Sequence, residues 1–163
     1  MTSSEPLIRR AGAGDGDALG RLGALLVQQH HSFDERRFLA PTPDTPEHYG
    51  AFLSSQLDAP DSVIIVAEHE GRVIGYAYGT LEGHDYVSLR GPAALLHDLI
   101  VDPDHRGRGA GRMLLNAILG VFSARRAPRV VLSAGERNAV AQKFFERESF
   151  RRTMVEMTRE LDQ

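Results

Sequence analysis

The most constraining part of the sequence is the stretch of residues 97–115. It begins with an apolar run at residues 99–101, turns at Asp102 and Pro103, and ends in a helical pattern that starts at Met113. A basic, glycine-rich loop at residues 106–111 lies between the turn and the helix. The order strand, loop, helix predicts an anion site, because loop amides and the positive end of the helix dipole converge there.

The composition of this loop indicates phosphate as its ligand. Glycines at 107, 109 and 111 leave five loop amides unobstructed, and Arg106, Arg108 and Arg112 add positive charge. An open loop of this kind suits a diphosphate, although a glycine-rich turn with solvated arginines is the alternative from these residues alone. No Lys or Ser/Thr follows Gly111, which argues against the nucleoside-triphosphate loop. Neither glycine cluster fits the dinucleotide-binding fingerprint G-x-G-x-x-G. Arg112 stands where this loop would continue towards its third small residue, and Asp17, after glycines 12, 14 and 16, stands where the first cluster would need its third glycine.

Length and composition limit the classes that the chain can belong to. With 163 residues, 42% hydrophobic and 25% charged, we expect a single globular domain over residues 1–163. The absence of cysteine excludes disulfides, thiolate metal sites and cysteine nucleophiles, and we expect no metal. A net charge of −3 gives little support to a nucleic-acid partner. No signal-peptide or membrane-spanning stretch is visible, so a cytoplasmic protein is expected.

Hydrophobic periodicity predicts an α/β (α+β) protein with a mixed sheet and helices on its faces. In the first half of the chain we expect a strand at 6–9, a helix carrying Leu19, Leu22, Leu25 and Leu26, a loop or short helix at 30–46, and a helix at 45–57. A hairpin of strands at 62–68 and 73–80 and a strand at 93–101 should follow. The second half should contain a helix ending near 126, a strand at 130–132, a helix at 138–148 capped by Asn138, and a closing strand at 150–161 with one face exposed to water.

Two motifs carry a family resemblance. Arg106, Gly109 and Gly111 fill the pattern R/Q-x-x-G-x-G/A after a strand, which resembles the acetyl-CoA-binding motif of the GCN5-related N-acetyltransferases (GNAT). The family's second signature is similar to Asn138, with Ala141 three residues on, Phe145 seven residues on, and Phe150 opening the last segment. Both motifs and the predicted elements follow the family's order over nearly the whole chain.

The resemblance implies a GNAT-type fold in which two central strands splay apart to admit the pantetheine arm of acetyl-CoA, the co-substrate. It also implies an enzyme, an acetyl-CoA-dependent N-acetyltransferase that acts on a primary amine of a small molecule by direct attack in a ternary complex. A protein-lysine or N-terminal acetyltransferase and a CoA-binding module without turnover are the alternatives, and a homodimer is compatible with the family. The residues implied in cofactor binding are Leu99, Ile100, Val101, Arg106, Gly107, Arg108, Gly109, Ala110, Gly111, Arg112, Asn138 and Phe145.

The same resemblance directs attention to His97 as general base. Polyamine-type members of the family carry a Glu at the matching strand position, and histidine exchanges protons near neutral pH. The alternative is a strand histidine that only forms a hydrogen bond with a neighbouring residue and has no catalytic role. Asp98 is adjacent, but strand alternation predicts that the two side chains point to opposite faces. Glu82 and Asp85 are candidates for binding a cationic amine or acting through water. A backbone N–H of Leu99 or Ile100 is the expected oxyanion donor.

Phe145 departs from the family pattern. Many members place a tyrosine there as general acid, and phenylalanine has no proton to give. Water, Ser133 or Tyr78 could protonate the thiolate instead, but a thiol pKa of about 8.5 favours departure without a dedicated acid. Ser149 likewise replaces the glycine that usually precedes the final aromatic.

The acceptor pocket in this family is built from the segments that correspond to residues 30–46 and 82–90. These segments carry both acidic and basic side chains, so the sequence leaves open whether the acceptor is a cation or carries a carboxylate. The acidic candidates are Asp34, Glu35, Glu82 and Asp85, and the basic candidates are Arg36, Arg37 and Arg90.

Overall fold

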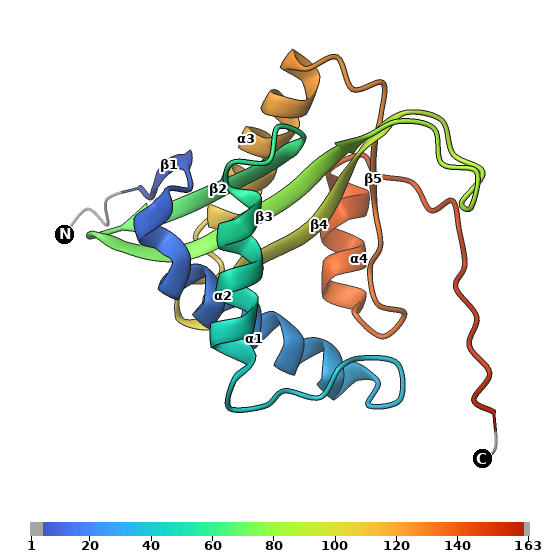
Figure 1. Ribbon diagram of the computed structural model, residues 1–163, viewed down its shortest axis with the longest axis horizontal. Coiled ribbons are helices and arrows are strands. Elements are labelled where there is room, and N and C mark those ends of the chain that lie inside the picture. Colours follow the sequence, from blue (N-terminus) through green and yellow to red (C-terminus); the bar gives the residue numbers. More distant parts are fainter. Residues whose placement is uncertain (1–4, 162–163) are drawn as a thin grey trace.

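The computed structural model describes residues 5–161, which form one five-stranded sheet in the order β1-β2-β3-β4-β5 (Figure 1). Neighbouring strands are antiparallel except β4 and β5, which are parallel. The elements are β1 (Leu7–Arg10), α1 (Gly16–Phe33), α2 (Thr45–Gln56), β2 (Ser62–His69), β3 (Arg72–Glu82), β4 (Ala93–Val101), α3 (Ala110–Ala124), β5 (Val130–Leu132) and α4 (Ala139–Arg147), with short 3-10 helices at Ala13–Asp15 and Pro103–His105.

Helices cover both faces of the sheet, as the sequence predicts. On one face α1 and α2 bury Leu19, Leu22 and Leu53 against apolar side chains of β2, β3 and β4. On the other face α3 buries a stripe of four side chains, and α4 stands beside the far end of the sheet (Figure 1). The α3 stripe consists of Leu114, Leu115, Ile118 and Phe122 at helical spacing.

Close packing of α1 on α2 depends on a glycine. A Cβ at Gly23 would lie 2.2 Å from Cδ1 of Tyr49, which is far inside van der Waals contact. Only glycine at this place on α1 therefore lets the Tyr49 ring of α2 lie flat between the helix and the sheet. The position of this ring matters for the site described below.

The predicted elements are confirmed from residue 7 to residue 147, with two shifts at their ends. Helix α1 continues to Phe33, four residues into the segment predicted as a loop or short helix at 30–46. Helix α2 begins at Thr45 as predicted, but its N-cap residue is Asp44. No helix of the described chain is long and apolar enough to cross a membrane.

The predicted closing strand at 150–161 is wrong. Residues 151–161 are extended and exposed, and they pair with no strand of the described chain. Figure 1 shows this segment running away from β5 towards the C-terminus. The alternating sequence gives the segment strand propensity, but a strand also requires an edge to pair with, and the chain leaves α4 in another direction.

The end of α4 sets that direction. Phe150 N–H donates to Phe145 O at 3.0 Å and Ser149 N–H donates to Glu146 O at 3.2 Å. Together with the packing of the Phe145 and Phe150 rings, these bonds form a Schellman motif. Such a motif needs a left-handed residue, and Ser149 has φ 69°. Ser149, which replaces the glycine usual in the family, therefore occupies a position where the backbone conformation favours glycine.

We expect Ser149→Gly to raise the free energy of unfolding by about 0.5–1 kcal/mol, because glycine adopts this φ without steric cost. Urea denaturation measures the change. Ser123→Gly is the matched control, since Ser123 is exposed and helical, and there glycine should destabilise. A Ser149→Gly protein less stable than the parent would contradict this account of the α4 end.

Candidate active site

The central feature of the site is a fork between two strands. Strands β4 and β5 pair only through residues 94–96 and 130–132. Beyond Leu96, β4 continues to Val101 while β5 has ended, so the backbone of residues 97–101 faces an open gap on that side. The splayed strands that the resemblance implies are therefore present.

A β-bulge at the mouth of the fork reorients β4. Tyr78 pairs with Asp98 and Gly79 with Leu96, which leaves His97 as the additional residue. The bulge switches the alternation of the strand: Leu96 packs in the core under α3, whereas Ile100 packs under α1 and α2. Without a bulge, residues 96 and 100 would share one face.

His97 and Asp98 consequently lie on the same face. The His97 ring stacks at 5.1 Å on Tyr78, whose own ring meets Phe52 of α2. Asp98 bonds to Tyr49 of α2. The sequence-based prediction that strand alternation would separate the two side chains is wrong, because a bulge breaks the period of two.

Thr80 fixes the orientation of His97. Its Oγ1 lies 2.8 Å from His97 Nε2 and 3.2 Å from Glu82 Oε1. A hydroxyl has one proton and an ionised carboxylate can only accept, so Thr80 donates to Glu82 and accepts from Nε2–H. The other ring nitrogen, Nδ1, then carries the lone pair. His97 itself is exposed at the surface of the fork.

Asp98 is a buried carboxylate held by two phenols. Its Oδ2 accepts hydrogen bonds from Tyr49 at 2.7 Å and Tyr76 at 2.8 Å. Burial raises the pKa of the Asp98 carboxyl, and the two phenolic hydrogen bonds only partly oppose the rise. Burial and the neighbouring carboxylate also raise the pKa of Tyr49 and Tyr76, so both stay protonated as donors.

The second oxygen of Asp98 is left open. No residue in the described chain donates a hydrogen bond to Oδ1, and no cationic side chain of residues 5–161 forms an ion pair with Asp98. Asp98 as a whole is 8% exposed. It can accept a donor from a bound molecule.

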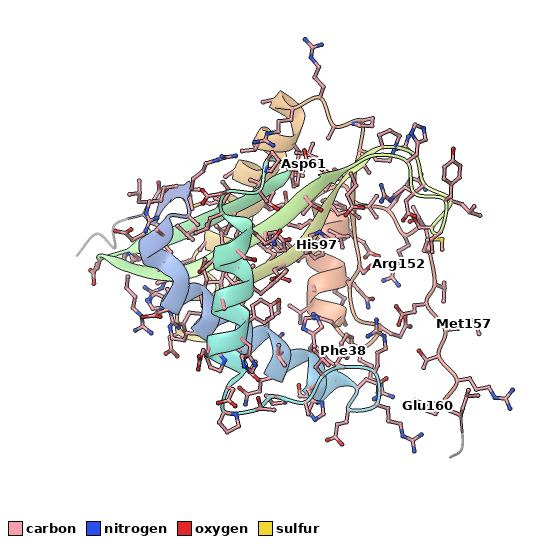
Figure 2. All side chains as sticks on the ribbon, in the orientation of Figure 1. Phe38, Asp61, His97, Arg152, Met157 and Glu160 are labelled. Atoms are coloured by element: carbon pink, nitrogen blue, oxygen red, sulfur yellow. The ribbon has the colours of Figure 1, made fainter. Side chains whose placement is uncertain are left out.

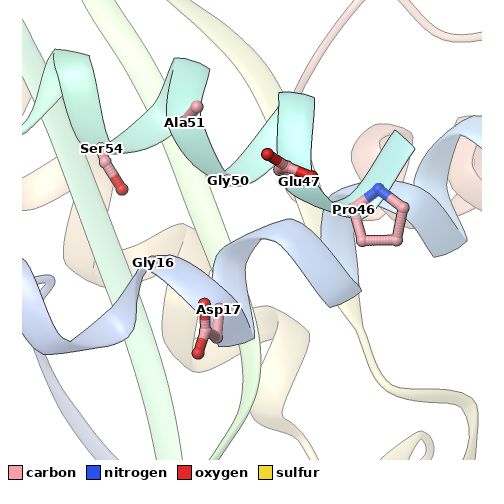
Figure 3. A pocket seen from close by; sticks show the side chains of 7 residues that line it. All are labelled: Gly16, Asp17, Pro46, Glu47, Gly50, Ala51 and Ser54. Atoms are coloured by element: carbon pink, nitrogen blue, oxygen red, sulfur yellow. The ribbon is translucent and has the colours of Figure 1, made fainter. Parts of the chain in front are cut away.

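A small cavity occupies the fork. It has a volume of about 130 Å³ and is lined by side chains of both strands, including His97. A larger hollow of about 450 Å³ lies between the first residues of α1 and the part of α2 from Pro46 to Ser54 (Figure 3). No candidate site residue lines this hollow, so the fork is the better candidate for chemistry. The fork cavity is lined by Leu95, Leu96, His97, Val131, Leu132 and Ser133.

The glycine-rich loop has the geometry of an anion site. Gly107 and Gly109 have φ 77° and 84°, a conformation that glycine adopts without strain. The N–H groups of residues 107–112 have no acceptor in the described chain, and the first helical bond at this end runs from Met113 N–H to Gly109 O. Six unpartnered donors at a helix N-terminus suit a phosphate ligand.

Asp102 anchors the start of this loop. Its carboxylate pairs with Arg21 at 2.9 Å and Arg72 at 3.5 Å, and accepts from Asp104 N–H. Burial alone would raise the pKa of Asp102, but the backbone hydrogen bond and the arginines outweigh it and lower the pKa. The turn between β4 and the loop is thereby tied to α1 and β3.

The three loop arginines differ in their contacts. Arg106 turns back to the strand, where Nε donates to Val101 O at 3.0 Å. Arg112 pairs with Glu148 at the end of α4. Arg108 makes no ion pair within residues 5–161. Arg106 and Arg112 thus each have a partner within the described chain, and the sequence-based expectation that all three arginines face the ligand stays a prediction.

The second motif lies beside the fork. Asn138 caps α4, as predicted, because its Oδ1 accepts from Ala141 N–H at 3.1 Å. Phe145 packs between Phe144 and Phe150 at 5.2 and 5.5 Å. It is thus an aromatic packing residue at the edge of the α3 core.

The end of α1 and the segment that joins it to α2 contact the loop that precedes α4. Arg137 donates to Phe33 O at 2.8 Å, and the Phe38 ring lies against Gly135, where a Cβ would be 3.6 Å away. Figure 2 shows Phe38 on the loop below His97. Two of the three arginines that the sequence offers for an acceptor are paired, Arg90 with Glu82 and Asp85 and Arg37 with Glu156. Arg36 is exposed and forms no ion pair within residues 5–161.

Three site residues were missed by sequence reasoning: Tyr49, Tyr76 and Thr80. A signal existed for two of them, because Tyr76, Tyr78 and Thr80 alternate on one strand and must share a face. Nothing in the sequence connects Tyr49 to Asp98, because the contact joins α2 to β4. No three His, Asp or Glu side chains of the described residues gather as a metal site.

Comparisons with known proteins agree with this geometry. Residues 27–150 match the model of the acetyltransferase (GNAT) family. The chain is 28% identical over 120 residues to an uncharacterized N-acetyltransferase of Mycobacterium tuberculosis, covering 68% of this chain and 72% of the relative. It is 32% identical over 102 residues to the uncharacterized N-acetyltransferase YhfO of Bacillus subtilis, covering 61% and 66%.

Solved structures share the fold. A tetramutant of the BH1408 protein from Bacillus halodurans has a TM-score of 0.81 at 21% identity, covering 95% of this chain and 99% of that one. An aminoglycoside N-acetyltransferase in complex with CoA has a TM-score of 0.75 at 18% identity, covering 99% and 98%. The match to the family model, the forked strands and the amide-lined loop lead to one conclusion: this chain belongs to the GNAT family and is an acetyl-CoA-dependent N-acetyltransferase.

Proposed function

We propose that the chain transfers the acetyl group of acetyl-CoA to the primary amine of a cationic small molecule, within a single domain and by direct attack in a ternary complex. The observation that carries this proposal is the pairing of an exposed histidine with a buried, cation-free carboxylate on one face of the fork. A base and an anion side by side suit an amine that arrives as ammonium and must lose a proton.

The loop and the open edge of β4 would hold acetyl-CoA. The amides of residues 107–112 receive the diphosphate, and the backbone of Leu99, Ile100 and Val101 pairs with the pantetheine arm. Asn138 and α4 flank the other side. When bound, the co-substrate supplies a thioester whose acyl carbon accepts the amine nitrogen.

His97 acts as the general base in this proposal. Thr80 and Glu82 are positioning residues, because they hold the proton on Nε2 and direct the lone pair of Nδ1 away from the strand. A free alkylamine has a pKa of about 10.4, so its proton must be removed near neutral pH. The N–H of Leu99 or Ile100 donates to the acyl oxygen as negative charge develops there.

Asp98 favours a cationic acceptor over an acceptor that carries a carboxylate. Its open oxygen can receive an ammonium hydrogen, whereas Arg90 and Arg37 are paired with carboxylates of the chain. Two aminoglycoside acetyltransferases share the fold, one of them in a structure with sisomicin. Aminoglycosides are amines, so this likeness supports an amine acceptor for this chain.

Assaying CoA release across amines tests the function. The chain has no cysteine, so a thiol dye reports only the released CoA. We expect turnover with polyamines or aminoglycosides, and a fall in kcat of about 100-fold or more in His97→Gln, which keeps a donor for Thr80 but lacks a base. CoA affinity should not change.

His84→Gln is the matched control, since His84 is exposed on the connection between β3 and β4. Turnover only with lysine peptides or protein N-termini would replace the small-molecule proposal by a protein acetyltransferase. If the chain binds CoA but releases no free CoA from acetyl-CoA with any amine, it is a CoA-binding module without turnover. An unchanged kcat in His97→Gln would remove His97 from the mechanism.

The loop geometry predicts that alanine substitution changes CoA affinity at Gly109 but not at Gly120. Gly109→Ala should weaken CoA binding about tenfold, or about 1.4 kcal/mol, because alanine disfavours φ 84° by about that amount. Calorimetric titration with CoA measures the change. Gly120→Ala is the control: it lies in α3 with equally open space around its Cβ, and its CoA affinity should equal that of the parent.

Because residue 145 is phenylalanine, we predict that the CoA thiolate leaves without a tyrosine at this position to protonate it. The ring is enclosed by Phe144 and Phe150, and a thiol pKa of about 8.5 lets the thiolate leave near neutral pH. Phe145→Tyr should therefore change kcat by less than about threefold, as measured by steady-state kinetics. A gain of ten-fold or more would show that protonation limits the parent enzyme.

A further inference from the structure

His30, in the last turn of α1, is a half-buried histidine that the catalytic proposal does not use. It lies seven residues after Gly23, against which the Tyr49 ring packs, and four residues after Leu26, whose side chain joins the same core. Residues at these spacings share one face of a helix. His30 therefore lies on the face of α1 that packs against Tyr49, about 10 Å further along the helix.

The ring of His30 is held in one orientation. Its Nδ1 lies 2.8 Å from Leu26 O, and its centroid lies 6.2 Å from that of Phe33 and 5.0 Å from that of Phe38, both in edge-on geometry. A carbonyl oxygen can only accept, so Nδ1 carries a proton, and in the neutral ring Nε2 keeps the lone pair. Leu26 O is the hydrogen-bond partner of this ring within residues 5–161, so Nε2 has no donor there.

Both phenylalanines that hold His30 contact the connection between β5 and α4. Phe38 lies against Gly135, where a Cβ would be 3.6 Å from its ring, and Phe33 O accepts a hydrogen bond from Arg137. His30 therefore stands beside the strand-to-helix connection that follows the fork (Figure 2 labels Phe38).

His30 is also near the buried carboxylate of the fork. Burial raises the pKa of the Asp98 carboxyl, and charge on His97 and on His30 opposes the rise. Electrostatic interactions weaken with distance and are screened by water. His30 and Asp98 are therefore close enough to contact one small molecule.

Three hydrogen-bond acceptors face this molecule: Nδ1 of His97, Oδ1 of Asp98 and Nε2 of His30. The described chain supplies none of them with a donor, so the site suits a molecule rich in N–H groups. The reacting ammonium can satisfy His97 and Asp98, which are neighbours on β4. His30 lies on α1, so its donor must come from a second group of the acceptor.

We propose that His30 binds a second nitrogen of the acceptor through Nε2, and that the acceptor is therefore a diamine or polyamine rather than a monoamine. This inference rests on the proposed function and names the substrate class of that site. The second ammonium donates to Nε2 of His30, while His97 removes the proton from the reacting nitrogen. The negative end of the α1 dipole, in the same last turn, also favours a cation there.

CoA release with straight-chain diamines, from diaminopropane to diaminohexane, tests this inference when each diamine is compared with the monoamine of the same chain length. The parent should prefer its best diamine by about tenfold or more in kcat/KM, as expected for a hydrogen bond to a charged group. His30→Asn should remove most of this preference without changing kcat/KM for the monoamine. Asparagine can still donate to Leu26 O, but it places no acceptor at the position of Nε2.

Two further variants separate the lone pair from the packing of the ring. His30→Gln should retain the preference, because its amide oxygen can reach the position of Nε2. His30→Phe should lose it, because the variant keeps an aromatic ring against Phe38 but has no acceptor. His48→Asn is the matched control: His48 is exposed on α2, and this variant should keep the preference of the parent.

Three results would overturn the inference and leave the proposed function standing: a parent that uses diamines and monoamines equally, a diamine preference that both His30→Asn and His30→Phe leave intact, and an equal fall with both kinds of amine. The last result would place His30 on the reacting ammonium. Release of no CoA with any amine would instead overturn the proposed function itself, and this inference with it.

Discussion

The parallel pairing between β4 and β5 is the constraint on which the structure depends. It lasts for three residue pairs and then stops, because β5 ends while β4 continues. Had β5 run on, the backbone of residues 97–101 would be satisfied inside the sheet and no molecule could pair with it. Because β5 is short, the backbone of β4 beyond Leu96 stays open on this side, and this is where we propose that acetyl-CoA binds.

The bulge at His97 gives this gap its chemistry. One additional residue in β4 places His97 and Asp98 on the same face, where Tyr49, Tyr76 and Thr80 hold them. A regular strand would direct one of the two side chains into the core under α3. The base and the anion in the proposed reaction are therefore a consequence of a backbone irregularity, and a bulge next to an active site is a recurrent device.

Charges near the site are mostly paired within the chain. Arg106 and Arg112 bond to the strand end and to α4, and Arg90 neutralises two carboxylates at the acceptor side. In the proposed binding mode the diphosphate therefore meets backbone amides, whose direction is set by Gly107 and Gly109. Asp98 forms no ion pair within residues 5–161. The proposed preference for a cationic acceptor rests on this unpaired carboxylate.

The sequence by itself determined the element order as far as α4, the position of the glycine-rich loop between β4 and α3, the Asn138 cap and the family. These depend on local patterns: periodicity, glycine spacing and capping residues. Tertiary structure alone decided three things. The bulge at His97 arises from the register between β3 and β4, the bond from Tyr49 to Asp98 joins residues 49 positions apart, and the last segment stays unpaired because the α4 end directs it away from β5. Each depends on how distant parts of the chain meet, and strand propensity in residues 150–161 cannot supply an edge to pair with.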